Sequence, residues 1–275
     1  MSVENTLNNV LVAIDPMENE QHALGRARMM NEFVEGGIKI HLFIALEQEK
    51  LYKIHDAQDY FRDATWVNEL IKPLVTEKIE HTAEVIWTEN WHVSILEASK
   101  RCNADMIIFS DYRKMDGSTD LSSSKWALLR DSDCPVLIVN PSSKLHRKTI
   151  LAAVNMQTDN PRYAGLNKKI INLTSLLADK YCAEKHIVNS CDNSEDFPDR
   201  AMLINNTDAQ QENIHVEIGN PIDVIAKIAD DIEADVVVIG TIARKGVMAA
   251  IRGNKSEGII RKLNRDVMVI NSTPN

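Results

Sequence analysis

Short runs of apolar residues alternate along the chain with longer segments in which apolar residues recur at helical spacing. The runs predict strands at 9–14, 39–45, 83–87, 106–110 and 136–139 in the first half, and at 149–154, 185–190, 214–218, 236–239 and 267–270 in the second. The runs are apolar throughout rather than alternating, which indicates strands buried on both faces, as in a parallel sheet.

The longer segments predict helices. Six of these lie at 20–33, 66–79, 91–102, 161–181, 221–232 and 254–263. Residues 192–212 are rich in Asp, Asn and Ser, and they predict a loop or a short, irregular helix. Strands separated by helices imply right-handed crossovers. The predicted fold is therefore α/β, with two tandem Rossmann-like, doubly wound domains, each a five-stranded parallel sheet flanked by helices.

The two halves repeat one pattern. Residues 10–15 (VLVAID) match residues 150–155 (ILAAVN), and an Ala-Asp pair that ends at Asp105 or Asp235 precedes the fourth strand of each half. The polar stretch 140–148 between them reads as a linker. We therefore expect one domain at 1–143 and a second at 144–275.

Composition and charge exclude several classes of protein. With 44% hydrophobic and 26% charged residues, the chain of 275 residues is an ordinary globular protein rather than a disordered one. Its net charge of −9 disfavours general nucleic-acid binding. No apolar run approaches the roughly 18 residues of a membrane helix. No signal peptide is visible at the start, so the expected location is the cytoplasm.

A glycine-containing, basic loop follows the fourth predicted strand of the second half. Gly240 lies at the strand exit, and Asn254 and Glu257 have the spacing of a helix start, whose free amides favour an anion. The candidate phosphate-binding residues of this loop are Gly240, Arg244, Gly246, Gly253, Asn254, Lys255 and Ser256. The alternative is that the glycines only shape a turn and the basic residues are only solvated. The spacing fits neither the P-loop nor the usual dinucleotide fingerprint.

The equivalent loop of the first half, residues 110–124, has one glycine and three aspartates, so we expect it not to bind phosphate. Catalytic and metal-binding patterns are missing as well. The histidines and cysteines lack metal-ligand spacing, and there is no GxSxG nucleophile motif. Asp15 ends its strand whereas Asp105 precedes its own, so the two carboxylates should lie at opposite edges of the sheet.

These features resemble the universal stress protein family in its tandem form, most like its E branch. Nucleotide-binding members carry a Gly-two-Gly-nine-Gly-Ser/Thr loop after strand four and an Asp at the end of strand one that meets adenine. Gly240 and Gly253 match this loop, whereas Ala243 and Asn254 depart from it. Asn155 replaces the strand-one Asp, which the first half keeps as Asp15. By resemblance, Val188 would line the base pocket.

The resemblance implies a stress-response regulatory protein that binds an adenine nucleotide, ATP or AMP, in its second domain, with a degenerate site in the first. The alternative is a scaffold, or a binder of another small molecule, with both nucleotide sites lost. A third hypothesis, a slow ATPase, needs a water-activating base that the sequence does not supply. We expect no nucleic-acid or membrane partner. We expect the domains to pack as an intramolecular pair, and a homodimer remains open.

Overall fold

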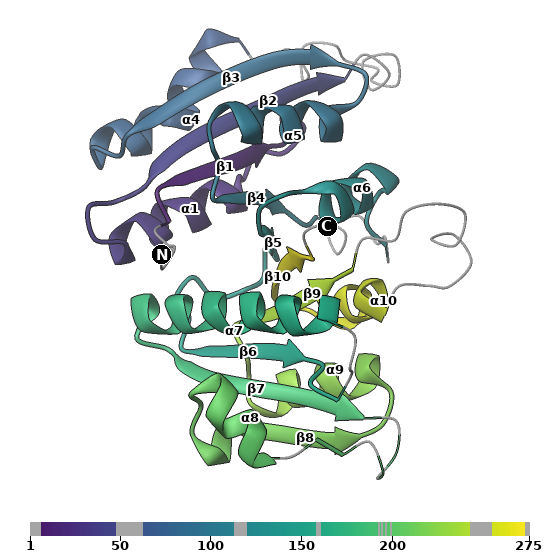
Figure 1. Ribbon diagram of the computed structural model, residues 1–275. Helices are drawn as coiled ribbons and strands as arrows, with labels where there is room; N and C mark the ends of the chain where they lie inside the picture. The colour runs from purple at the N-terminus through teal and green to yellow at the C-terminus, as the bar shows by residue number, and fades with distance from the viewer. Residues whose placement is uncertain are drawn as a thin grey trace. The chain divides into compact units, whose positions relative to one another are not determined.

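A computed structural model describes residues 7–47, 63–112, 120–157, 161–191, 193, 195, 197–198, 200–242 and 255–272. The chain divides into two compact units (Figure 1). The first consists of Met1–Tyr112 and Ser122–Pro141, and the second consists chiefly of Ser142–Asn275. None of the described helices is both long and apolar enough to cross a membrane.

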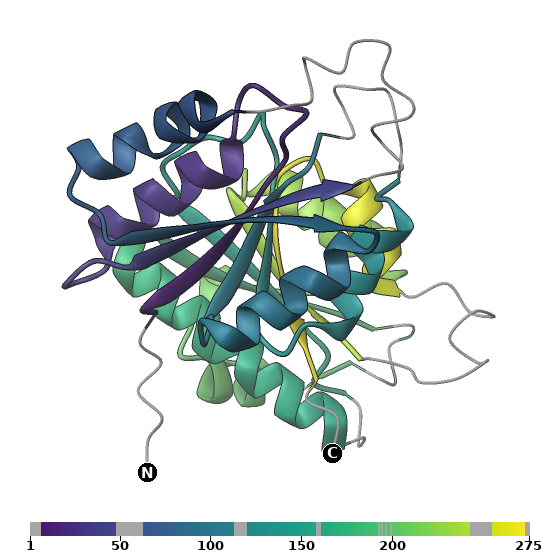
Figure 2. The same ribbon diagram turned by 90° about the horizontal axis from the view of Figure 1, so that it is seen from above.

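The first unit alternates strands and helices. In chain order its elements are β1 (Asn9–Ile14), α1 (His22–Phe33), β2 (Lys39–Glu47), α4 (Ala64–Thr76), β3 (His81–Thr88), α5 (Trp91–Arg101), β4 (Met106–Ser110), α6 (Ser123–Asp131) and β5 (Val136–Val139). The strands pair in parallel, in the order β3-β2-β1-β4-β5. The helices α1 and α5 lie on opposite sides of this sheet (Figure 2). The unit is therefore doubly wound, as the pattern of strands and helices predicts.

The second unit repeats this arrangement. Its elements are β6 (Thr149–Val154), α7 (Pro161–Tyr181), β7 (Glu184–Cys191), α8 (Arg200–Thr207), η1 (Gln211–Asn213), β8 (Ile214–Ile218), α9 (Pro221–Asp231), β9 (Val236–Thr241), α10 (Lys255–Lys262) and β10 (Asp266–Asn271). The strands are again parallel, in the order β10-β9-β6-β7-β8. The helix α7 packs on β6 and β9, and α9 packs on β7. The short helix α8 falls where the sequence predicts a loop or a short helix.

The central strands form the core of each unit. Every residue of β4 and β5 is buried, and so is most of β1, β6 and β9. The edge strand β3 differs, because Val85 and Trp87 are 49% and 55% exposed. These burial patterns explain why the continuous apolar runs marked the inner strands so clearly.

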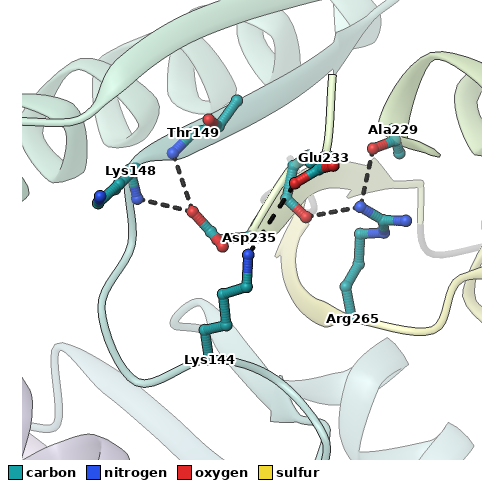
Figure 3. Close-up of polar contacts among 8 residues, drawn as sticks. Lys144, Lys148, Thr149, Ala229, Glu233, Asp235 and Arg265 are labelled. Carbon is teal, nitrogen blue, oxygen red and sulfur yellow. Dashed lines mark hydrogen bonds and ion pairs between the residues drawn. The ribbon is translucent and has the colours of Figure 1, made fainter. Parts of the chain in front are cut away.

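In each unit, an aspartate before the fourth strand binds backbone N–H groups at the start of the first strand, a contact that we call the aspartate clasp. The Asp105 carboxylate accepts hydrogen bonds from the backbone N–H groups of Asn8 and Asn9, both at 2.8 Å. The Asp235 carboxylate accepts from the N–H groups of Lys148 and Thr149, at 2.6 and 3.0 Å (Figure 3). The repeated Ala-Asp pair thus has a structural role. The position of Asp105 confirms that it lies at the opposite edge of the sheet from Asp15.

The stretch between the repeats is anchored by a buried ion pair. The Arg147 guanidinium donates to the Asp266 carboxylate at 2.9 Å, and both side chains are fully buried. The same guanidinium lies over the Tyr181 ring, 5.2 Å from its centroid. The end of the predicted linker is therefore part of the core of the second unit.

Candidate functional site

The strand order reverses between β1 and β4 in the first unit and between β6 and β9 in the second. In open parallel sheets, ligands bind beyond the carboxyl ends of the strands at such a switch point. In the first unit this place contains an open cavity. In the second unit hydrogen-bonded amide side chains lie at the strand ends.

The cavity of the first unit, which we call the first-unit cleft, has a volume of about 340 Å³. This is within the usual size range of small-molecule sites, roughly 300–1,000 Å³. Its walls come from the ends of β1, β2 and β4 and from the starts of α5 and α6. The lining residues are Ala13, Ile14, Asp15, Pro16, Phe43, Ala45, Trp91, Phe109, Ser110, Tyr112, Ser122, Ser124 and Lys125. The cleft thus combines aromatic walls with a few polar groups, a combination typical of ligand sites.

Asp15 lies at the end of β1 and lines one side of the cleft. One oxygen of its carboxylate accepts a hydrogen bond from the Met17 N–H at 3.0 Å. The Gln21 side chain accepts from the Asp15 N–H and donates to the Asp15 carbonyl, which fixes the backbone there. Asp15 is therefore a positioned carboxylate on the cleft wall, able to accept a hydrogen bond from a ligand N–H group.

The start of α6 supplies the groups that favour an anion. Ser122 caps this helix, because its hydroxyl accepts from the Lys125 N–H at 3.4 Å. The Lys125 ammonium lies 5.4 Å from the centroid of the Phe109 ring and donates to the Ser110 carbonyl. The Trp91 indole N–H donates to the Ser124 hydroxyl at 2.9 Å, which links the starts of α5 and α6. Positive charge and hydroxyl groups thus gather on one wall.

Tyr112 closes another wall of the cleft. Its hydroxyl donates to the Glu20 carbonyl at 2.7 Å. Burial, the largest cause, raises the pKa of Tyr112 to about 12. The phenol therefore stays protonated near neutral pH and holds the turn before α1.

In the second unit, amide side chains fill the ends of β6 and β7. Asn189 is fully buried, accepts from the Met156 N–H at 2.8 Å and donates to the Gln157 side chain at 2.7 Å. Asn167, on α7, accepts from the Asn155 N–H and donates to the Asn155 carbonyl. The Asn155 side-chain oxygen is itself buried and has no hydrogen-bond partner among the described residues. It is therefore an acceptor that a ligand donor could satisfy.

The structure assigns packing roles to two residues of the predicted phosphate loop. A Cβ on Gly240 would lie 2.5 Å from Leu166 Cδ2, so the glycine lets α7 pack closely on β9. The Ser256 hydroxyl, near the start of α10, donates to the Gly240 carbonyl at 3.0 Å. Both residues thus serve the fold at this strand end, whatever else they bind.

The other predicted site residues are spread out. Val188 is fully buried within β7, between its neighbours Ala153 and His215. Lys255 is exposed and begins α10. Arg244, Gly246, Gly253 and Asn254 lie outside the described residues. The second-domain phosphate site therefore stays a prediction for most of its loop.

The residues that sequence reasoning missed are Trp91 and Lys125. They come from helix starts rather than from a glycine-rich loop. A signal that could have helped is the run of serines at 122–124 before Lys125, since serine is a common helix cap. Within the described parts of the chain, no three His, Cys, Asp or Glu side chains gather closely enough to hold a metal ion.

Comparison with known proteins places this fold in a family. The universal stress protein family matches residues 6–140 and 174–271. Universal stress protein E of Escherichia coli K12 is 26% identical over 95% of this chain and 93% of its own length. The Haemophilus influenzae homologue of that protein is also 26% identical, over 95% of this chain and 96% of its own.

Solved structures agree with this match at the level of the fold. A Pseudomonas aeruginosa UCBPP-PA14 structure, described as a universal stress protein, superposes with a TM-score of 0.81 at 24% identity, covering 97% of this chain and 94% of its own. A universal stress protein from Archaeoglobus fulgidus gives 0.67 at 22% identity, over 98% and 97% of the two chains. Two consecutive doubly wound α/β units in one chain define a tandem protein of the universal stress class. The chain belongs to the universal stress protein family, in its tandem, E-like form.

Proposed function

We propose that the protein is a stress-response regulator that binds a small ligand in the first-unit cleft. The observation that carries this proposal is the cavity of about 340 Å³ at the switch point, which combines aromatic walls with Asp15 and Lys125. A regulator needs a site whose occupancy changes with conditions in the cell. An open cleft between strand ends and helix starts provides one without any catalytic group.

The chemistry of the cleft favours a flat ring that carries an N–H donor and an anionic group. The Asp15 carboxylate would accept from the ring, aromatic side chains would contact its faces, and Lys125 with the hydroxyls at the start of α6 would hold the anion. An adenine nucleotide has all three features. The sequence that leads into α6, residues 110–124, carries three aspartates, and this negative charge disfavours a long polyphosphate, so we expect AMP to bind more tightly than ATP.

Calorimetric titration of the full chain with AMP and with ATP tests this proposal. Asp15→Asn keeps the contact with the Met17 N–H but removes the charge, and Lys125→Gln removes the ammonium. Each should weaken AMP binding about tenfold or more, as expected for the loss of a charged hydrogen bond. Lys100→Gln, an exposed ion-paired lysine on α5, is the control. The proposal fails if AMP does not bind at millimolar concentration, or if both variants bind like the wild type.

A second candidate is the nucleotide site that the sequence predicts in the second domain. Its support is the buried Asn155 side-chain oxygen, which lacks a partner among the described residues, together with Lys255 at the start of α10. If this site binds the nucleotide, Asn155→Leu and Lys255→Gln should weaken binding while Asp15→Asn should not. Native mass spectrometry of the purified protein addresses the remaining alternative, a scaffold without a nucleotide, because a retained nucleotide adduct would contradict it.

A further inference from the structure

Two histidines face each other across the edge of the second unit. The His186 Nδ1 and the His215 Nε2 atoms are 3.0 Å apart, and the two rings are nearly parallel, at 10°, with centroids separated by 5.3 Å. His186 lies on β7 and is buried, whereas His215 lies on the edge strand β8 and is half-buried. The contact therefore ties an edge strand to its neighbour through side chains, in addition to the backbone ladder.

A hydrogen bond between two imidazole nitrogens needs one donor and one acceptor. The pair can form it when both rings are neutral, or when they carry one extra proton between them. With two extra protons every ring nitrogen bears a hydrogen, so a donor faces a donor at 3.0 Å and two positive charges meet. The contact then becomes repulsive.

Charged groups surround the two rings. From β7, the Glu184 carboxylate lies 3.5 Å from His186 Nε2. Glu217 on β8 and Asp231 on α9 favour protonation of His215, whereas Arg200 on α8 opposes it. The neighbouring turn η1 contributes the neutral Asn213, whose amide donates to Glu184 at 3.0 Å. Carboxylates therefore lie beside the pair on both strands.

We propose that the His186–His215 pair is an acid-sensitive latch on β8: a second extra proton breaks the contact between the rings and loosens this edge strand from β7. The ion pair between Lys227 and Glu217, at 2.8 Å, holds the opposite end of β8 and does not depend on a histidine. Loosening would therefore begin near His215 and remain local to the edge of the second unit.

Burial, the largest cause, lowers the pKa of His215, and the positive charge of His186 lowers it further. The folded state thus binds the second proton more weakly than the unfolded chain does. The stability that this pair contributes is therefore present above the ordinary histidine pKa of about 6.5 and is lost as the pH falls below it.

Hydrogen exchange of the full chain, read on a peptide that contains residues 214–218 and corrected for intrinsic rates, tests the latch. Between about pH 7.5 and about pH 5.5, protection of this strand should fall about fivefold, the effect expected for loss of one hydrogen bond. His215→Gln keeps an amide donor for His186 but takes up no proton, so its protection should not fall. His146→Gln, an exposed histidine of the same unit, should behave like the wild type. Unchanged protection in the wild type, or an equal fall in His215→Gln, would overturn the proposal.

Nuclear magnetic resonance titration of the wild-type imidazoles supplies a readout that does not depend on a variant. The two rings should titrate as a coupled pair, in two separated steps, with the second clearly below the ordinary histidine range. Two independent titrations near the ordinary value would contradict the latch even if His215→Gln failed to fold.

Discussion

Gly240 shows how one residue can fit two explanations. The sequence favours a role in binding phosphate, because Gly240 follows a strand and opens a basic loop. The structure gives a packing role, since Leu166 and Ile170 of α7 occupy the space that a side chain would need. These roles differ in what a methyl group at this position would change. One affects stability and the other affects binding.

Gly240→Ala should destabilise the protein by about 1–3 kcal/mol, the usual cost of overpacking a close contact. Its Cβ would meet Leu166 Cδ2 at 2.5 Å and Ile170 Cδ1 at 3.0 Å. Urea unfolding measures the change. Gly165→Ala, on the exposed side of the same helix α7 with open space around it, is the matched control and should be neutral or stabilising. Equal stability of Gly240→Ala and the wild type would show that α7 yields easily, and would remove the packing explanation.

The first-unit cleft also shows what single residues reveal before the fold is known. Asp15 stood out because it ends a strand and matches a family position. Trp91 and Lys125 did not, because their place in the cleft depends on how two helix starts converge on the strand ends. The aspartates in the loop 110–124 predict that negative charge disfavours phosphate there, but they do not determine whether the strand ends leave a cavity.

At the scale of elements, the strands and most helices could be predicted because their apolar pattern follows from burial. The central strands are buried on both faces and read as continuous apolar runs. What the pattern could not show are contacts made by charged residues. Arg147 lies in a polar stretch that reads as a linker, yet its side chain is fully buried against Asp266. Only the fold places the two residues together, 119 positions apart.

The aspartate clasp should contribute measurably to the second unit. Asp235→Ala removes an acceptor for the backbone N–H groups of Lys148 and Thr149, and it should cost about 2–3 kcal/mol, as for hydrogen bonds to a charged group. Asp235→Asn keeps an oxygen acceptor and should cost less. Denaturant unfolding measures both. Lys144→Ala is the control, because its ion pair with Glu233 is long, 4.0 Å, and highly exposed. If Asp235→Ala were as stable as this control, the clasp would have no energetic role.

For the whole molecule, the tandem repeat raises the question of which unit responds to a ligand. Both units share one topology, and the first has an open cavity at its switch point. A ligand that binds only the folded state stabilises the unit that holds it. The effect should therefore be unequal between two domains of nearly the same design.

With AMP at about 100 times its dissociation constant, the first unit should gain about 2.7 kcal/mol. Hydrogen exchange should then slow in β1 and β4 but not in the equivalent strands β6 and β9. The two halves of one chain thus serve as each other's control in a single experiment. Slowing confined to β6 and β9 would assign the site to the second unit, as the sequence predicts. Equal slowing in both would indicate two sites.

The two aspartate clasps restrict which amino acids the chain can carry at the positions they bind, and the side chains at those positions do not reveal this restriction. Asp105 and Asp235 hold backbone N–H groups, so the side chains of residues 8, 9, 148 and 149 take no part in the clasp. Almost any amino acid could replace them without breaking it. Proline could not, because it has no N–H to offer. In a saturation library of these four positions, the folded protein should therefore tolerate most substitutions at each position but not proline.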